Sequence, residues 1–368
     1  MPPEHAAGAC ERCVRRCLLL GELGPLLDYA SSDRERLTAL LALDDLELIE
    51  ALGGRRRKQL HSWYARVRAA RLEPPAGGST ICVHDRHFPA RLRADGQPRL
   101  LTVLGGPTRL SELIARPIVA LLGCERPSDY GVAVTRALAR GVTAAGATVV
   151  AGLGAGVARA AHDAAGELGG SLAVLGSGLA GEDRGARLAR SHCARRGCAV
   201  SELAWSTDGR RWGPVAAERI VAALAAAVVV VESPTAPRGL WAAECARAEG
   251  TPLGAVPGML TNPMAAGPHA LLSAGARLVR GPSDVLEMLY DSDAPAVSSS
   301  APGLAPTAQR VLELIGAGLD TPERLAAEIA PPDGGDDWAL VAALGELESL
   351  GLVSRGEQGR YVRCDLPA

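Results

Sequence analysis

Two patterns of hydrophobic and polar positions divide most of the chain. In residues 10–72, apolar side chains recur three and four positions apart, as between Leu18 and Leu27 and between Leu37 and Ile49, which is typical of amphipathic helices. A Pro- and Gly-rich cluster at 74–78 then ends this pattern and marks a boundary. The pattern predicts an N-terminal helical domain over residues 1–78, of the SAM or helix-hairpin-helix kind.

Residues 79–290 follow a different pattern, in which short apolar runs alternate with amphipathic stretches. The runs are continuously apolar, which indicates strands with both faces covered. Regular alternation of such strands with helices predicts βαβ units and a Rossmann-like, doubly wound α/β sheet. We expect strands at 117–123, 148–152, 171–176, 199–203, 228–232 and 252–258, and helices at 131–145, 158–168, 183–196, 214–226, 238–249 and 267–274.

The last part of the chain predicts a linker and a third domain. Residues 291–306 are rich in Ser, Pro and Ala, which is typical of a flexible linker. Residues 307–368 have the pattern of three helices followed by a two-stranded ribbon with a turn around Gly356–Gly359. We therefore predict a winged helix over residues 307–368.

Composition and charge restrict the class of protein. The hydrophobic fraction of 48% and the charged fraction of 22% are those of a globular chain of 368 residues. The longest apolar run, Ile220–Val231, has 12 residues, fewer than the roughly 18–20 that a membrane helix needs. No secretory signal is visible, so we expect a cytoplasmic protein that does not contact the membrane.

The charge is unevenly distributed. Residues 79–290 hold 22 basic and 17 acidic residues, whereas residues 307–368 hold 5 basic and 11 acidic residues. Because neutralising phosphates supplies most of the affinity for nucleic acids, the middle domain is the better candidate for binding them. Lys58 is the only lysine, so contacts with phosphate would come from Arg, backbone amides or hydroxyl groups.

Nine cysteines include one CxxC pair, Cys10 and Cys13, with His5 and Cys17 nearby. A zinc site needs a second ligand pair, and no second CxxC or CxxH follows, although His61 could contribute a ligand. The pattern therefore favours thiols without a metal, and we expect neither a metal nor a cofactor.

Two glycine-rich turns between a strand and a helix carry the candidate chemistry. Such turns offer backbone amides and a helix N-terminus to an anion. The first turn, Gly123–Gly131, could add the Arg126 guanidinium and the Ser128 hydroxyl, although a tight structural turn fits its spacing equally well. The second turn, Gly152–Gly156, lacks the G-x-G-x-x-G spacing of a dinucleotide site, so we interpret it as a surface that holds phosphate.

Other positions are weaker candidates. His162 falls within the helix after the second turn and is better explained as a hydrogen-bonded structural residue than as a base. Ser201-Glu202, Glu218-Arg219, Glu232-Ser233 and Val256–Gly258 come at or before strand ends, where open α/β sheets bind ligands. The candidate phosphate- or DNA-binding residues are Gly123, Arg126, Ser128, Tyr130, Gly131, Gly152, Gly154, Gly156, His162, Gly176, Gly178, Arg187 and Arg219.

The order of these motifs resembles the DNA-processing protein A family (DprA, also called Smf) over nearly all of the chain. No single one of these motifs is specific to the family, but their order along the chain is. The matching segments are His87–Leu92, Gly123–Gly131, Ala151–His162, Leu172–Leu179, Ser201-Glu202, Arg219–Leu224, Val229–Glu232, Ala255–Gly258 and Gly267–Ala276.

Several positions depart from the family pattern. Glu125 stands where the family has the Arg of its GSR motif, with Arg126 one position later, and Ala158 replaces an Asp. Ala217 and Glu218 align with an Arg and an Asn. The SGSLxTA segment is shortened to Arg238–Ala243, and Ala180–Asp183 replaces a Tyr-Pro pair.

The resemblance implies a protein that is not an enzyme and that binds single-stranded DNA. It implies that such a protein protects incoming DNA during natural transformation and recombination and loads the RecA recombinase, usually as a homodimer. One alternative is a degenerate paralogue that acts as a protein-interaction scaffold through its acidic winged helix. Another is a nucleotide N-glycosidase of the lysine-decarboxylase-like Rossmann kind, although Val256–Thr261 lacks the glutamate of that family's PGGxGTxxE motif.

Overall fold

A computed structural model of the chain describes residues 9–67, 72, 74–94, 96–181, 184–195, 197–234, 241–290, 306–329, 338–349, 352–356 and 360–364. It separates into two compact units, residues 1–292 and residues 293–368. The predicted linker lies mostly outside the described residues, as do His5 and the tip of the predicted ribbon turn.

The first unit is built on a nine-stranded sheet with the order β1-β2-β6-β5-β4-β3-β7-β8-β9. Seven neighbouring strands run parallel to one another, namely β6, β5, β4, β3, β7, β8 and β9. By contrast, β2 pairs antiparallel with both β1 and β6. The strands are β1 (Gly78–Cys82), β2 (Leu100–Leu104), β3 (Ile118–Leu122), β4 (Thr148–Gly152), β5 (Ser171–Leu175), β6 (Cys198–Ser201), β7 (Ala227–Val230), β8 (Leu253–Ala255) and β9 (Arg277–Leu278).

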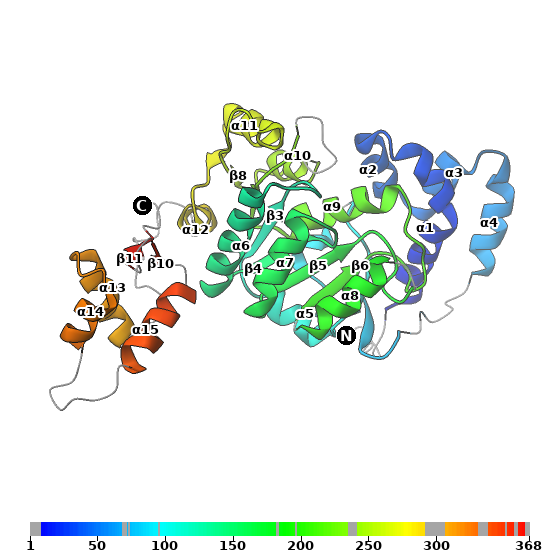
Figure 1. Cartoon of the computed structure of the whole chain (residues 1–368). Helices are drawn as coiled ribbons and strands as arrows, with labels where there is room; N and C mark the ends of the chain where they lie inside the picture. The colour runs from blue at the N-terminus through cyan, green and yellow to red at the C-terminus, as the bar shows by residue number, and fades with distance from the viewer. Residues whose placement is uncertain are drawn as a thin grey trace. The chain divides into compact units, whose positions relative to one another are not determined.

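Helices cover the sheet, and α1–α4 lie together at one end of this unit (Figure 1). The helices are α1 (Glu11–Ala30), α2 (Arg34–Ala42), α3 (Asp45–Gly53), α4 (Arg57–Arg66), α5 (Pro107–Ile114), α6 (Asp129–Ala144), α7 (Val157–Glu167), α8 (Arg184–Ala194), α9 (Trp212–Leu224), α10 (Trp241–Ala248), α11 (Ala266–Ser273) and α12 (Pro282–Tyr290). Short 3₁₀ helices lie at Gly54–Arg56, Ala90–Arg93 and Pro263–Ala265.

The continuous apolar character of the strands is explained by two hydrophobic cores, one on each face of the sheet. Successive side chains of a strand point to opposite faces. In β3, Val119 and Leu121 belong to the core under α6, α7 and α12, whereas Ala120 and Leu122 belong to the core under α5, α9 and α10. Every residue of β3 is buried, as expected for a sheet covered by helices on both sides.

The topology places a switch point at the carboxyl end of β3. From β3 the chain builds β4, β5 and β6 on one side and then returns to place β7 on the other side. Open α/β sheets bind their ligands at such a switch point, beyond the carboxyl ends of the strands. The fold class predicted from the strand–helix alternation is therefore confirmed, while the antiparallel pair β1–β2 was not predicted, because only a short 3₁₀ helix is described between these strands.

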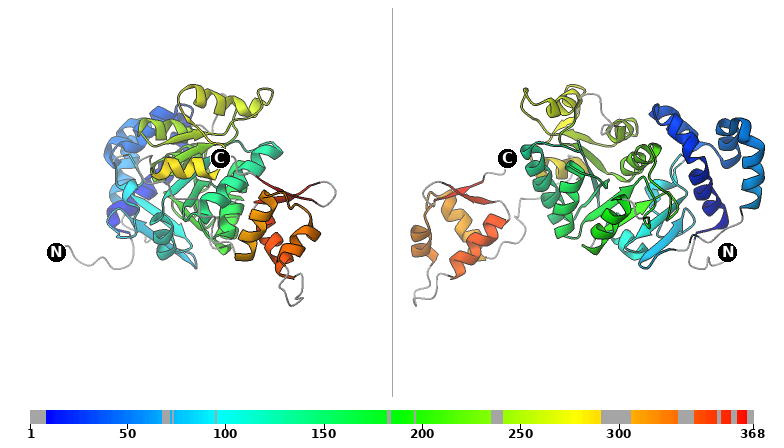
Figure 2. Two further views of the ribbon diagram at one scale, coloured as in Figure 1. Left: turned by 90° about the vertical axis from the view of Figure 1, so that its left-hand side faces the viewer. Right: turned by 45° about the vertical axis from the view of Figure 1, so that its right-hand side comes forward.

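The four N-terminal helices pack against the sheet unit and share a core with it. Leu19, Leu23 and Leu27 of α1 lie in the same buried cluster as Trp212 and Ala216 of α9. Figure 2 shows α1–α4 grouped at one end of this unit. Asp33 caps α2 by accepting a hydrogen bond from the Arg36 amide.

The second unit contains three helices and a two-stranded antiparallel ribbon, with its own hydrophobic cluster. The elements are α13 (Pro306–Gly316), α14 (Pro322–Ile329), α15 (Trp338–Ser349), β10 (Val353–Arg355) and β11 (Tyr361–Arg363). Their order is the one the sequence indicates, and the winged-helix arrangement and the domain limits stay predictions. Across both units, none of the described helices combines the length and the hydropathy that crossing a membrane requires.

Candidate nucleic-acid interface

Three turns meet at the carboxyl edge of the parallel sheet. They follow β3, β4 and β5 and lead into α6, α7 and α8. Figure 1 shows α6 and α7 side by side, with α8 beyond them. Since a helix N-terminus presents free amides and a partial positive charge, this edge has the geometry that favours an anion.

The first two turns pack so closely that glycine is required. At Gly156, with φ of +67°, a Cβ atom would lie 2.3 Å from the Cys124 carbonyl oxygen. At Gly123, a Cβ atom would lie 2.5 Å from Cγ2 of Val157. The Val157 amide also donates to the Cys124 carbonyl at 3.1 Å. These two predicted glycines thus fix the shape of the edge by close backbone packing.

Gly154 has a different environment, because a Cβ atom there would meet nothing within 4 Å. Within the described part of the chain, the amides of Gly154 and Ala155 have no hydrogen-bond partner. They are therefore available to an anion at the N-terminus of α7.

Basic side chains surround this turn. The Arg126 side chain is exposed and makes no hydrogen bond or ion pair with the residues described here. Arg159, in the first turn of α7, is 66% exposed and pairs only loosely with Asp163 at 3.4 Å. Arg184 and Arg187 are exposed on the first turn of α8. Arg159 and Arg184 were not among the residues predicted from the sequence. Their position directly after a strand and its turn could have identified them.

The first turn directs most of its donors inward, onto the buried carboxylate of Glu232. This side chain is 1% exposed. Its oxygens accept from the Ser128 amide and hydroxyl, both at 2.7 Å, and from Nδ2 of Asn262 at 2.9 Å. An acidic group of the protein itself therefore occupies the anion position at the N-terminus of α6.

Other groups of the first turn complete this arrangement. Ser128 is the N-cap of α6 and accepts from the Gly131 amide at 3.1 Å. A Cβ atom at Gly131 would lie 2.3 Å from Oε2 of Glu232. The Tyr130 hydroxyl donates to the Pro257 carbonyl at 2.9 Å, while the side chain remains 48% exposed. The structure thus leaves the Tyr130 ring and Arg126 as the outward-facing groups among the candidates of this turn.

His162 lies behind the second turn and is 4% exposed. Its Nε2 lies 3.1 Å from the Gly152 carbonyl, which can only accept, so Nε2 carries the proton and Nδ1 accepts from the Ser171 hydroxyl at 2.8 Å. Burial lowers the pKa of His162 to about 3. These contacts agree with the structural role that the sequence favours.

Gly176 and Gly178 form the third turn and pack against the chain before and at the start of α9. A Cβ atom at Gly176 would lie 2.1 Å from the Gly213 carbonyl carbon, and one at Gly178 would lie 2.4 Å from the Trp205 carbonyl oxygen. The Gly178 amide donates to the Thr207 carbonyl at 2.7 Å. Both glycines therefore permit close packing inside the unit.

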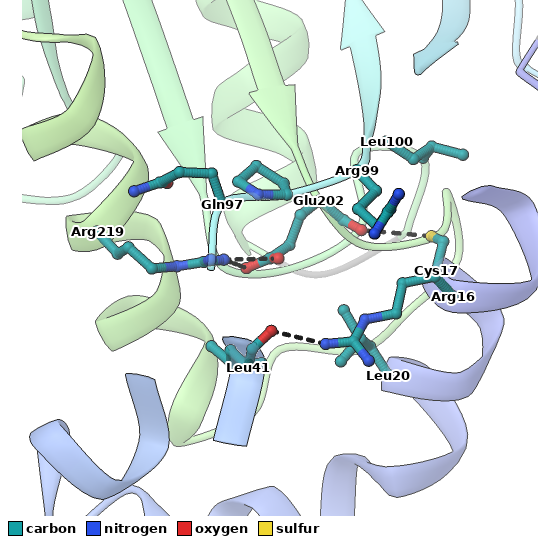
Figure 3. A pocket seen from close by; sticks show the side chains of 10 residues that line it. Arg16, Cys17, Leu20, Leu41, Gln97, Arg99, Leu100, Glu202 and Arg219 are labelled. Carbon is teal, nitrogen blue, oxygen red and sulfur yellow. Dashed lines mark hydrogen bonds and ion pairs between the residues drawn. The ribbon is translucent and has the colours of Figure 1, made fainter. Parts of the chain in front are cut away.

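Arg219 lines a small cavity of about 10 Å³ between the sheet and the N-terminal helices, beyond the end of β6 (Figure 3). It is 4% exposed, and its Nη2 donates to both carboxylate oxygens of Glu202 at 2.7 and 2.8 Å. Its Nη1 donates to the Gly96 carbonyl, and the Cys17 thiol donates to the Glu202 carbonyl at 3.3 Å. Arg219 and Glu202 thus link α9 to the end of β6 and to the loop before β2.

The described residues contain one group of side chains with metal-ligand chemistry: Cys10, Cys13, Cys82 and His84. Cys17 is not part of it, and His61 instead contacts Glu50 at 2.7 Å. Sequence analysis recognised the first pair but not Cys82 and His84, which are separated from that pair by about 70 residues and have only one residue between them.

The fold and this edge define a Rossmann-like α/β protein with turn amides unpaired among the described residues and with exposed arginines beyond the carboxyl ends of its strands. Residues 79–290 match the family model described as DNA recombination-mediator protein A. The chain therefore belongs to that family, in agreement with the resemblance carried by its motifs.

Characterised relatives cover much of the chain. It is 34% identical to the protein Smf of Escherichia coli over 251 residues, which are 66% of this chain and 62% of that protein. It is 29% identical to the putative DNA processing protein DprA of Mycobacterium tuberculosis over 311 residues, 83% of this chain and 76% of the relative. The chain therefore spans less than two thirds of the length of the first of these relatives.

Solved structures show the same fold. DNA processing protein A of Streptococcus pneumoniae superposes with a TM-score of 0.58 at 24% identity, over 74% of this chain and 95% of that one. DNA processing protein A of Helicobacter pylori, whose structure was described for its single-stranded DNA binding mode, gives a TM-score of 0.50 at 24% identity, over 58% of this chain and 95% of that one.

Proposed function

We propose that this protein binds single-stranded DNA along the carboxyl edge of its parallel sheet. The observation that carries the proposal is the N-terminus of α7, where the Gly154 and Ala155 amides have no partner among the described residues, with exposed arginines of the first turn, α7 and α8 around it. Amides at helix N-termini and guanidinium groups are the protein's two main phosphate ligands. Membership of the recombination-mediator family, and the single-stranded DNA binding described for the Helicobacter pylori protein, support the same ligand.

Within this proposal the candidates take different roles. Arg126, Arg159, Arg184 and Arg187 contact phosphates, together with the amides of Gly154 and Ala155. The exposed ring of Tyr130 offers a surface on which a base can stack, which contributes about 1–3 kcal/mol per base in single-strand binding.

The remaining candidates shape or support the edge from within. Gly123, Gly131 and Gly156 allow the turns to approach one another, and Ser128 fixes the first turn to Glu232. His162, Gly176, Gly178 and Arg219 act through packing and internal hydrogen bonds.

We further propose that the protein processes DNA during transformation or recombination in the cytoplasm, protects the strand and delivers it to RecA recombinase as a homodimer. The names of the relatives support the processing role. RecA loading, dimerisation and the absence of an enzymatic activity rest on the family resemblance.

The test is direct binding of the whole chain to a labelled oligonucleotide, measured by fluorescence anisotropy at two salt concentrations. We expect binding to single-stranded DNA that weakens as salt increases, because phosphate contacts release counterions. Duplex DNA of the same length is the comparison. An absence of binding at low salt would contradict the proposal and favour the scaffold alternative, in which the protein has lost its DNA contact.

A further inference from the structure

The N-terminus of α1 and the end of β1 bring four soft ligands together. Cys10 is the N-cap of α1 and Cys13 lies in its first turn, while Cys82 is the last residue of β1 and His84 follows two positions later. Their three sulfur atoms and one imidazole nitrogen all lie within 4.8 Å of one another. A helix and a strand that are far apart in the sequence therefore supply two ligands each.

The distances fit tetrahedral coordination of one ion. Nδ1 of His84 lies 3.4 Å from the Cys10 sulfur, 3.7 Å from the Cys82 sulfur and 4.0 Å from the Cys13 sulfur. Zinc–sulfur bonds of about 2.3 Å and a zinc–nitrogen bond of about 2.0–2.1 Å would separate sulfur and nitrogen by about 3.6 Å in a tetrahedron. The observed separations lie on both sides of this value.

The surroundings of the cluster favour thiolate ligands. The Cys10 amide donates to the Cys82 sulfur at 3.4 Å, and hydrogen bonds of this kind hold metal-bound ligands in place. Cys10 and Cys13 also lie at the positive end of a helix of 20 residues, which stabilises negative charge. Cys13 and Cys82 are buried together with Val14, Cys17 and Leu100, so an apolar shell covers one side of the cluster.

We propose that Cys10, Cys13, Cys82 and His84 bind one Zn²⁺ ion as a structural site that fastens the N-terminal helices to strand β1. A set of three thiolates and one imidazole in tetrahedral geometry is typical of zinc. All four ligands come from the protein, which is the pattern of structural sites, whereas catalytic zinc keeps a position open for water or substrate. In the sheet, β2 and β6 separate β1 from β5, the nearest of the three strands whose turns form the proposed DNA-binding edge.

A disulfide within the CxxC pair is the competing explanation. It would use only Cys10 and Cys13 and would leave the approach of Cys82 and His84 unexplained. The two explanations differ in an observable way, because zinc binding keeps the three cysteines reduced and shields them from alkylation.

The test is metal analysis of the full chain, purified without a histidine tag under reducing conditions. We expect about one zinc per chain by plasma mass spectrometry. The paired substitution Cys10→Ser with Cys13→Ser should reduce the zinc content at least five-fold. Cys245→Ser, which removes a half-buried thiol of α10 outside the cluster, is the matched control and should keep the zinc.

A second measurement does not depend on the folding of a variant. X-ray absorption at the zinc edge of the unmodified chain should fit three sulfur ligands and one nitrogen ligand. Zinc below about 0.1 per chain after reconstitution with Zn²⁺, equal zinc in the Cys10/Cys13 variant and the control, iron in place of zinc, or a Cys10–Cys13 disulfide in the unreduced chain would each overturn the proposal.

Discussion

Replacing Arg219 by Ala tests whether this residue supports the fold or contacts DNA. The Arg219 and Glu202 side chains are 4% and 5% exposed, and Arg219 supplies two hydrogen bonds to the Glu202 carboxylate. Arg219→Ala removes the cation that pairs with this buried carboxylate, and it also removes a donor from the Gly96 carbonyl. Breaking a buried pair in this way costs about 3–5 kcal/mol, because the remaining charge is left without a partner.

The assay is urea denaturation of the whole chain, followed by tryptophan fluorescence. Arg140→Ala is the matched control, since Arg140 pairs with Glu167 on the surface at 49% and 57% exposure, and such pairs contribute about 0–1 kcal/mol. The double variant Arg219→Met with Glu202→Leu should recover most of the lost stability, because no buried charge remains. A loss below about 1 kcal/mol for Arg219→Ala, together with weaker DNA binding, would refute the structural role.

Three further predictions concern charge and protonation. Glu125→Arg should tighten binding to single-stranded DNA about five-fold at low salt, because it removes a repulsion on the order of 1 kcal/mol beside a bound phosphate; unchanged or weaker affinity in a titration would show that the strand avoids this turn. Deletion of residues 305–368 should leave the affinity of the folded remainder close to that of the whole chain, since the removed part carries 11 acidic residues against 5 basic ones; a folded truncation with most of its affinity lost would place the contact on the C-terminal unit. Burial lowers the pKa of His162 to about 3 and that of His192 to about 4, so below pH 6.5 the unfolded chain binds more protons than the folded chain. The free energy of unfolding should therefore fall as the pH decreases from about 6.5 towards 4. Equal stability of the wild type at pH 7 and pH 5 would contradict this.

The strand–helix alternation was sufficient to predict the central sheet because both of its faces are buried. The continuous apolar runs of β3, β4, β5 and β7 identify strands covered by helices on both sides, and the glycine turns mark where each strand ends. The antiparallel strands β1 and β2 could not be predicted in the same way. Only a short 3₁₀ helix is described between them, and the pairing of β2 with β6 depends on contacts between distant segments.

The candidate site could be predicted only at the level of its turns. Spacing identified the glycines that let the two turns approach each other. It could not show that the Ser128 donors face the Glu232 carboxylate, or that Arg219 is buried against Glu202, because only the fold brings the members of each pair together. The cluster of Cys10, Cys13, Cys82 and His84 escaped sequence reasoning for the same reason, since only the fold brings α1 beside β1.

The most direct test of the central claim is the salt dependence of single-stranded DNA binding by Arg126→Ala, compared with Arg140→Ala from the far end of the same strand–helix unit. The Arg126 side chain is exposed beside the α7 N-terminus, whereas Arg140 lies near the end of α6. We predict that Arg126→Ala binds all sequences more weakly and lowers the slope of log K against log salt concentration by roughly one unit, while Arg140→Ala behaves like the wild type. An unchanged affinity and slope for Arg126→Ala would contradict the placement of the DNA at this edge.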